Sequence, residues 1–95
     1  MEKKELFEKK IQSFEEWWIR IVGHKPKEKL MWFFKKGMEK QIEVRENGEP
    51  PMVGERYFID AALLDDEHYP TREEFKDCQR AFCQGFYTDM RVYYA

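Results

Sequence analysis

The chain has 95 residues, of which 38% are charged and 17% are aromatic, and its formal net charge is -2. This length predicts a single domain covering residues 1–95. Disordered chains have few aromatic residues and a large net charge, so that class is excluded. The opening MEKKELFEKK has no apolar signal-peptide core, and the longest apolar runs are too short to span a bilayer. We therefore expect a globular protein of the cytoplasm.

The first predicted helix covers residues 3–22. Its apolar residues recur with 4-3-4-3 spacing, which places them on one helix face: Phe7, Ile11, Phe14, Trp18 and Ile21. Leu6, Trp17 and Val22 widen this face to roughly 160°, enough to contact two neighbouring elements. Gly23 stands where a glycine commonly ends a helix.

The second predicted helix begins near Pro26, whose ring suits a first helical turn, and runs to about Glu46. Asn47-Gly48 and Pro50-Pro51 then stop it. The four-residue steps of one apolar face run through Leu30, Phe34, Met38 and Ile42. An alternative ends this helix near residue 40 and pairs QIEVR with RYFID as a β-hairpin within residues 41–61, because both stretches alternate. That hairpin would need an unusually long loop, so the helix is preferred.

The last predicted helix has the clearest start. Thr71 and Glu74 form the T-x-x-E pattern of a capping box. An apolar stripe then continues almost to the C-terminus, through Phe75, Cys78, Phe82, Phe86, Met90 and Tyr93. The preceding segment of about twenty residues is predicted as a long, partly ordered loop, in which RYFIDAALL could pack as a short strand or helical turn. The predicted fold is therefore mainly α, with three helices, and a small α+β domain is the alternative.

Two cysteines, Cys78 and Cys83, lie five residues apart on this last helix. They would point about 140° apart around the helix axis, and their Cα atoms would lie beyond disulfide reach. No second pair completes a zinc site. We expect free thiols that act as small core residues.

Trp32 is the outlier in the stretch KLMWFFKK. On a helical wheel it falls about 200° from Leu30, opposite the apolar face and among charged residues. Three interpretations compete. Another segment of the chain could cover the indole, the indole could anchor a protein interface, or it could stack on nucleic-acid bases beside lysines that contact phosphates. The candidate interaction residues are Trp32, Lys29, Lys35, Lys36 and Lys40.

Charge is divided along the chain. Residues 24–40 hold six lysines against two glutamates, net +4, whereas residues 41–69 hold two arginines against eight acids, net -6. The acidic segment could fold back against the basic helix, or either surface could steer a partner. The pI near 5.7 argues against general nucleic-acid binding, for which a basic domain is expected.

Chemistry-bearing residues are sparse. Asp60, Asp65, Asp66, Glu67 and His68 could hold a divalent metal, but a solvated acidic turn before a helix is the preferred interpretation, with Asp65, Asp66 and Glu67 as an acidic surface. Gln79 and Asp89 intrude on the apolar face of the last helix. Either they line a polar pocket or a helix–helix interface, or the helix end frays and Asp89 is solvated. No catalytic motif, phosphate loop, cofactor site or metal site is predicted.

These features favour a non-enzymatic protein-interaction module that occupies a partner's surface. The apolar faces are wider than three short helices require for packing against one another. This excess points to self-association or to another protein as partner. Short chains with few motifs suit small inhibitors or accessory factors, such as viruses and mobile elements encode. The alternative is a nucleic-acid or nucleotide binder that uses the basic helix of residues 25–40.

Overall fold

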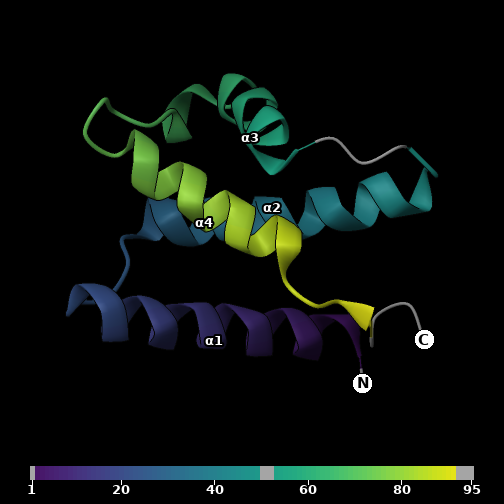
Figure 1. Ribbon diagram of the computed structural model, residues 1–95, viewed down its shortest axis with the longest axis horizontal. Coiled ribbons are helices and arrows are strands. Elements are labelled where there is room, and N and C mark those ends of the chain that lie inside the picture. Colours follow the sequence, from purple (N-terminus) through teal and green to yellow (C-terminus); the bar gives the residue numbers. More distant parts are fainter. Residues whose placement is uncertain (1, 50–52, 92–95) are drawn as a thin grey trace.

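The computed structural model describes residues 2–49 and 53–91, and this part of the chain is helical and contains no strand. Its elements are α1 (Lys3–Val22), α2 (Glu28–Glu46), α3 (Gly54–Leu63), the 3-10 turn η1 (Asp66–His68) and α4 (Phe75–Tyr87). Figure 1 shows α4 lying across α2, with α1 on one side of this pair and α3 on the other. The predicted mainly α class is confirmed.

The first two helices have nearly the bounds that the sequence predicts. Gly23 ends α1 in the left-handed conformation, with φ at 93°, and its N–H donates to the Ile19 carbonyl oxygen at 2.8 Å. The predicted apolar face of α2 is buried along its whole length. The apolar face of α1 is only partly used, because Ile21 and Val22 at its end are exposed. Ile21 belongs to the apolar face by its spacing but is not part of the core.

The segment predicted as a long loop contains the fourth helix. Residues 54–63 form α3, and residues 41–46 belong to α2, so the alternative hairpin within residues 41–61 is wrong. The three-helix count is likewise not confirmed. No side chain within the segment caps the start of α3; instead the Gly54 N–H donates to the Tyr87 hydroxyl oxygen at 2.9 Å. Contact with α4 thus provides a hydrogen-bond acceptor for the Gly54 N–H, which has no acceptor within α3.

The capping box before α4 forms as predicted. The Thr71 N–H donates to Glu74 Oε1 at 3.0 Å, and the Glu74 N–H donates to Thr71 Oγ1 at 3.2 Å. The helix ends at Tyr87, earlier than the apolar stripe predicts, although Met90 beyond it is only 2% exposed. Tyr93, the last residue of the predicted stripe, lies outside the described residues.

A side chain from α2 stabilises the end of α4. The Gln41 amide nitrogen lies 2.7–3.2 Å from three backbone carbonyl oxygens, those of Gly85, Phe86 and Thr88. Carbonyls at a helix C-terminus lack partners within the helix. One amide from a neighbouring helix therefore fixes both the end of α4 and the position of α4 against α2.

Two glycines mark the point where α2 and α4 cross, and this is the largest interface between helices in the fold. A Cβ added at Gly37 would overlap the Phe82 carbonyl oxygen, and one added at Gly85 would overlap the Phe34 carbonyl oxygen. Each helix therefore offers a bare backbone surface to the other. This close approach needs glycine at both positions.

Aromatic side chains fill the core around this crossing. Phe58 of α3 is fully buried, with its ring centroid 5.2 Å from that of Phe33 on α2 and 5.9 Å from that of Phe82 on α4. Among the described residues, no polar or charged side chain is buried. Phe58 thus helps to anchor the short helix α3 between the two crossing helices, together with the buried Tyr57 and Ala62.

Both cysteines are free thiols, as predicted. Cys78 is fully buried and Cys83 is half-buried. Burial raises the pKa of each thiol to about 11. Within the described ranges, no helix is long and apolar enough to cross a membrane.

Candidate functional site

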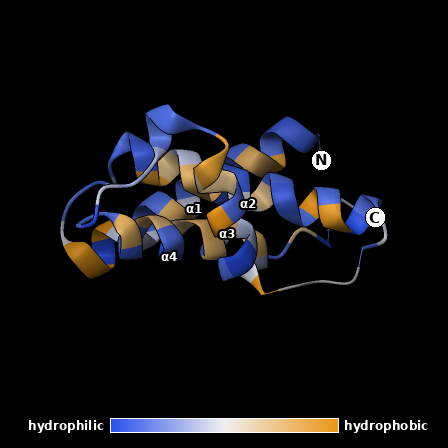
Figure 2. Ribbon diagram, turned by 90° about the horizontal axis from the view of Figure 1, so that it is seen from above, coloured by the Kyte–Doolittle hydropathy of each residue, from blue (hydrophilic) through white to orange (hydrophobic). Residues whose placement is uncertain are grey.

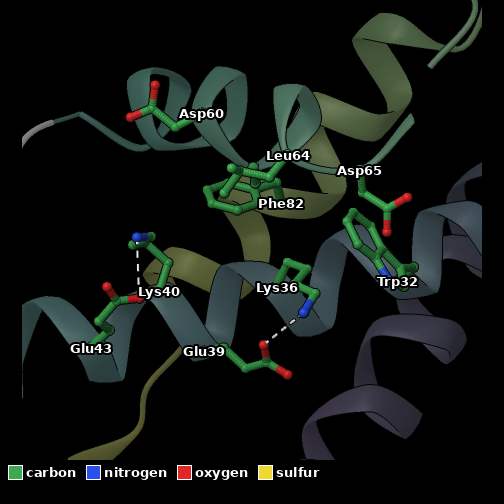
Figure 3. A pocket seen from close by; sticks show the side chains of 10 residues that line it. Trp32, Lys36, Glu39, Lys40, Glu43, Asp60, Leu64, Asp65 and Phe82 are labelled. Carbon is green, nitrogen blue, oxygen red and sulfur yellow. Dashed lines mark hydrogen bonds and ion pairs between the residues drawn. The ribbon is translucent and has the colours of Figure 1, made fainter. Parts of the chain in front are cut away.

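A groove of about 290 Å³ lies between α2 and α3, with Phe82 of α4 among its lining residues. Figure 3 shows the charged side chains of α2 below this groove, and above it Asp60 of α3 and Leu64, the residue after α3. We call it the α2–α3 groove. Its lining residues are Trp32, Lys36, Glu39, Lys40, Glu43, Asp60, Ala61, Leu64, Asp65 and Phe82.

Trp32 stands at one end of the α2–α3 groove. Its indole stacks on the His68 ring of η1, with centroids 4.1 Å apart and planes 2° apart, and meets the Phe33 ring edge-on at 4.8 Å. The Lys36 ammonium lies 5.3 Å from the indole centroid. The side chain is half-buried and packs against the core. The interpretation in which another segment covers Trp32 is therefore supported in part, by the His68 ring.

The turn that carries His68 is held by Asp65. Its Oδ1 accepts from the N–H groups of Glu67 at 3.0 Å and His68 at 3.4 Å, and its Oδ2 lies 3.0 Å from His68 Nδ1. The hydrogen bond with the His68 side chain is the main reason that the pKa of Asp65 falls below its ordinary value. Asp65 thus positions the imidazole that stacks on Trp32.

The predicted acidic surface is divided between two environments. Asp66 and Glu67 are exposed, as expected for a solvated turn, whereas Asp65 is half-buried and bonded to His68. One ligand atom from each of Asp65, Glu67 and His68 lies within 4.8 Å of the others, so these residues could approach a metal ion. The capping bonds already occupy the Asp65 carboxylate, and this gives the cluster a structural role.

The predicted interaction lysines do not form one surface. Lys36 and Lys40 line the α2–α3 groove and bond within α2, to Glu39 at 3.2 Å and Glu43 at 3.1 Å. Lys29 instead bonds to Glu74 Oε1 at 2.9 Å, and this bond is the largest cause that lowers the Glu74 pKa to about 2. Lys35 is exposed and does not line the groove.

The two walls of the groove differ in charge. The α2 wall is neutral, because the Lys36 and Lys40 ammonium groups are paired with Glu39 and Glu43 on the same wall, whereas the α3 side presents the acidic Asp60 and Asp65. The Asp60 side chain is exposed and has no hydrogen bond or ion pair within residues 2–49 and 53–91. This carboxylate is therefore available to a binding partner.

The predicted polar pocket does not form. Gln79 lines a shallow surface hollow with Glu55 and Cys83, but Asp89 lies beyond the end of α4 and is exposed. Asp89 bonds to the Arg91 side chain at 2.8–3.1 Å, and these hydrogen bonds lower its pKa to about 2. The alternative interpretation, a solvated Asp89 after the helix end, is the correct one.

The sequence prediction did not identify Leu64 as a groove residue or His68 as the ring that stacks on Trp32. Leu64 follows α3 and is 87% exposed, although it lines the groove. The run AALLDD contained a signal for it, because adjacent leucines cannot share one helix face. His68 was considered as a possible metal ligand, and nothing local places it on an indole 36 positions away.

No protein-family model matches this chain, and no curated protein and no solved structure is significantly similar to it.

Proposed function

We propose that this protein is a non-enzymatic protein-interaction module, of the kind that small inhibitors and accessory factors represent, and that it binds its partner through the α2–α3 groove. The observation that carries the proposal is the partly exposed Trp32 at the end of a groove lined by side chains of both charges. The complementary partner surface is a protein segment with an apolar side chain flanked by charges of both signs.

The composition of the groove supports this choice of partner. Tryptophan is enriched among residues that dominate binding energy at protein interfaces, especially where surrounding groups exclude water. The stacked His68 ring holds the indole in place before binding, which reduces the entropy lost on association. Leu64 adds a large apolar side chain at the rim of the same groove.

The charge arrangement weighs against the nucleic-acid alternative. Lys29, Lys36 and Lys40, three of the lysines in the basic segment, are each bonded to a glutamate. Carboxylates of Asp60 and Asp65 also line the groove in which Trp32 lies. A phosphate backbone would be repelled there, whereas a protein surface can match both signs.

The test compares Trp32→Ala with the matched variant Trp17→Ala. Trp17 is also half-buried, but it lies on α1 and does not line the groove. The protein retained stoichiometrically by the immobilised wild type is purified and titrated against each variant. We expect Trp32→Ala to weaken binding by about 2 kcal/mol or more, as for an interface anchor. Trp17→Ala should bind like the wild type.

Melting curves separate binding from folding. Because Trp32 is only partly buried, its replacement should reduce stability by less than the roughly 3–5 kcal/mol typical of a fully buried tryptophan. A normal binding isotherm together with a collapsed melting temperature would refute the interface. Binding to nucleic acid that weakens steeply with salt and with Lys35→Ala would favour the alternative instead.

A further inference from the structure

The α2–α3 groove carries an excess of negative charge. Two lysines and four carboxylates line it, which gives the lining residues a net charge of -2. On the α2 wall each lysine is paired with a glutamate of the same wall, at 3.2 and 3.1 Å, so that wall is neutral. The excess charge therefore comes from Asp60 and Asp65 on the α3 side.

Asp60 is the carboxylate of the groove that has no partner. The Asp65 side chain bonds to the His68 ring at 3.0 Å and to two backbone N–H groups. The Asp60 side chain is exposed and makes no hydrogen bond or ion pair with the described residues, 2–49 and 53–91. Arg56, one turn earlier on α3, makes no ion pair with it and does not line the groove. The lining residues thus present one unpaired negative charge.

The lysines of the α2 wall are already engaged by aromatic rings as well as by glutamates. The Lys40 ammonium lies 5.5 Å from the centroid of the Tyr57 ring. The Lys36 ammonium lies 5.3 Å from the Trp32 centroid. Ring faces attract cations at these distances. Pairing Asp60 with either lysine would break such a contact, so we expect its cation to come from a binding partner.

Exposed apolar side chains lie one helical turn after Asp60. Leu64, which lines the same groove, is 87% exposed, and the neighbouring Leu63 is 64% exposed. Figure 2, which views the molecule from above, shows apolar and polar residues mixed along α3. Exposed apolar clusters are typical of surfaces that bind another protein. A free divalent cation would leave these leucines uncovered, and it requires more oxygen ligands than one unpaired carboxylate supplies.

We propose that the α2–α3 groove binds a protein segment in which a lysine or arginine lies beside a large apolar residue. The cation of this segment pairs with Asp60, and its apolar residue packs on Leu64. The inference rests on the proposed function, because it names the charge that the partner of the same site must carry.

Exclusion of water would strengthen this ion pair. An ion pair on an open surface contributes little to binding. The apolar residue of the partner and Leu64 would together exclude water from the Asp60 carboxylate, and the attraction rises as the local dielectric constant falls. Removing one charge of such a desolvated pair typically weakens an interface at least about tenfold.

The first experiment selects random peptides, displayed on phage, on the immobilised protein. We expect the enriched peptides to contain lysine or arginine beside leucine, isoleucine or phenylalanine. Enrichment of acidic or uncharged peptides would overturn the inference, and so would the absence of any enriched peptide.

The second experiment measures the affinity of an enriched peptide for two variants. Asp60→Asn should weaken binding at least about tenfold. The matched control Asp66→Asn removes the same charge from an exposed position outside the groove and should bind like the wild type. Both side chains are exposed, so the melting temperatures should stay unchanged. Equal effects of the two substitutions would indicate only general electrostatic attraction and would overturn the assignment of Asp60.

The third experiment exchanges the charges of the pair. Asp60→Lys should lose the enriched peptide, and a peptide whose basic residue is replaced by glutamate should bind Asp60→Lys more tightly than it binds the wild type. A glutamate peptide without this preference would overturn the pairing. Leu64→Gln should weaken the original peptide about fivefold or more, as for an interface contact, whereas Ile21→Gln at an exposed site on α1 should not.

Failure of this inference can be told apart from failure of the proposed function. Peptide binding that Trp32→Ala abolishes but Asp60→Asn leaves unchanged would refute the basic partner and leave the interaction module standing. Peptide binding that neither substitution weakens would refute both. If no peptide is enriched, titration of the retained partner protein against Trp32→Ala still tests the interaction module by itself.

Discussion

Replacing Gly85 by alanine perturbs the fold at the crossing of α2 and α4. The new Cβ would overlap the Phe34 carbonyl oxygen and lie 3.0 Å from the Met38 nitrogen. Both atoms belong to the backbone of α2, so neither can rotate away as the end of a flexible side chain could. The helices must therefore separate, and the aromatic contacts around the crossing loosen.

The expected loss of stability is the difference between two effects. Overpacking a well-packed site costs typically 1–3 kcal/mol, and rigid backbone neighbours place this site at the upper end. Alanine is favoured over glycine inside a helix by about 0.5–1 kcal/mol, which offsets part of that loss. The net reduction in the free energy of unfolding is then about 2 kcal/mol. For a domain of this size, that corresponds to a decrease of roughly 8–16 °C in Tm.

Urea unfolding followed by circular dichroism measures this difference, and Gly54→Ala is the matched control. A Cβ at Gly54 would meet only side-chain atoms, including Tyr87 Cε2 at 3.1 Å, and that ring is exposed and able to move. We expect Gly54→Ala to change stability by less than about 0.5 kcal/mol, as for sites that can relax. A Gly85→Ala variant as stable as the wild type, or more stable, would refute the close crossing.

The reciprocal glycine extends the test. A Cβ at Gly37 would overlap the Phe82 carbonyl oxygen, so Gly37→Ala should separate the same two helices. Once one substitution has moved them apart, the second has less to disrupt. The double variant should therefore lose less stability than the sum of the single variants, by about 0.5 kcal/mol or more. Strict additivity would show that the two sites do not share one contact.

Three further predictions concern bonds and burial described above. Gln41→Glu should lower the free energy of unfolding by about 2 kcal/mol or more near neutral pH, because a carboxylate would face three carbonyl oxygens. The loss of stability should be smaller in acid, where the protonated carboxyl group can donate a hydrogen bond. A loss that does not change with pH would contradict this reasoning. Because the pKa of Glu74 is lowered from 4.5 to about 2, its contribution to stability is full above pH 4.5 and is lost as pH falls toward 2. In denaturant titrations over this pH range, the Glu74→Gln variant should lose less stability than the wild type loses. Cys78 and Cys83 should react slowly with a thiol reagent at pH 8 in the native protein and rapidly in urea, and rapid native labelling of both would contradict their burial.

The long helices could be predicted because their signals are local. The apolar period of α2, the glycine after α1 and the capping box at Thr71 all lie within or beside the helices that they define. The short helix α3 could not be predicted in this way. Its ten residues include a stretch that alternates like a strand, and the hydroxyl bonded at its start comes from Tyr87, 33 positions later. Tertiary contacts decide its conformation.

For the candidate site, the helical wheel identified Trp32 and placed Lys36 near it, because both positions follow from the pitch of one helix. It could not show which lysines share a surface with the indole. Lys29 is turned toward Glu74 by a capping box 45 positions away, and His68 reaches the indole through a turn that Asp65 holds. Such contacts depend on how separate segments dock, and the apolar pattern of one helix does not predict that docking.

Two helix ends in this protein, the start of α3 and the end of α4, are completed by other helices. Tyr87 of α4 bonds to the start of α3, and Gln41 of α2 bonds to the end of α4. An isolated peptide of the ten α3 residues lacks these partners and is too short to be helical in water. Folding and docking of these helices are therefore one event. Native-state hydrogen exchange should show the amides at the ends of α3 and α4 opening together with the core, and at the same free energy, where ordinary helix ends would fray first.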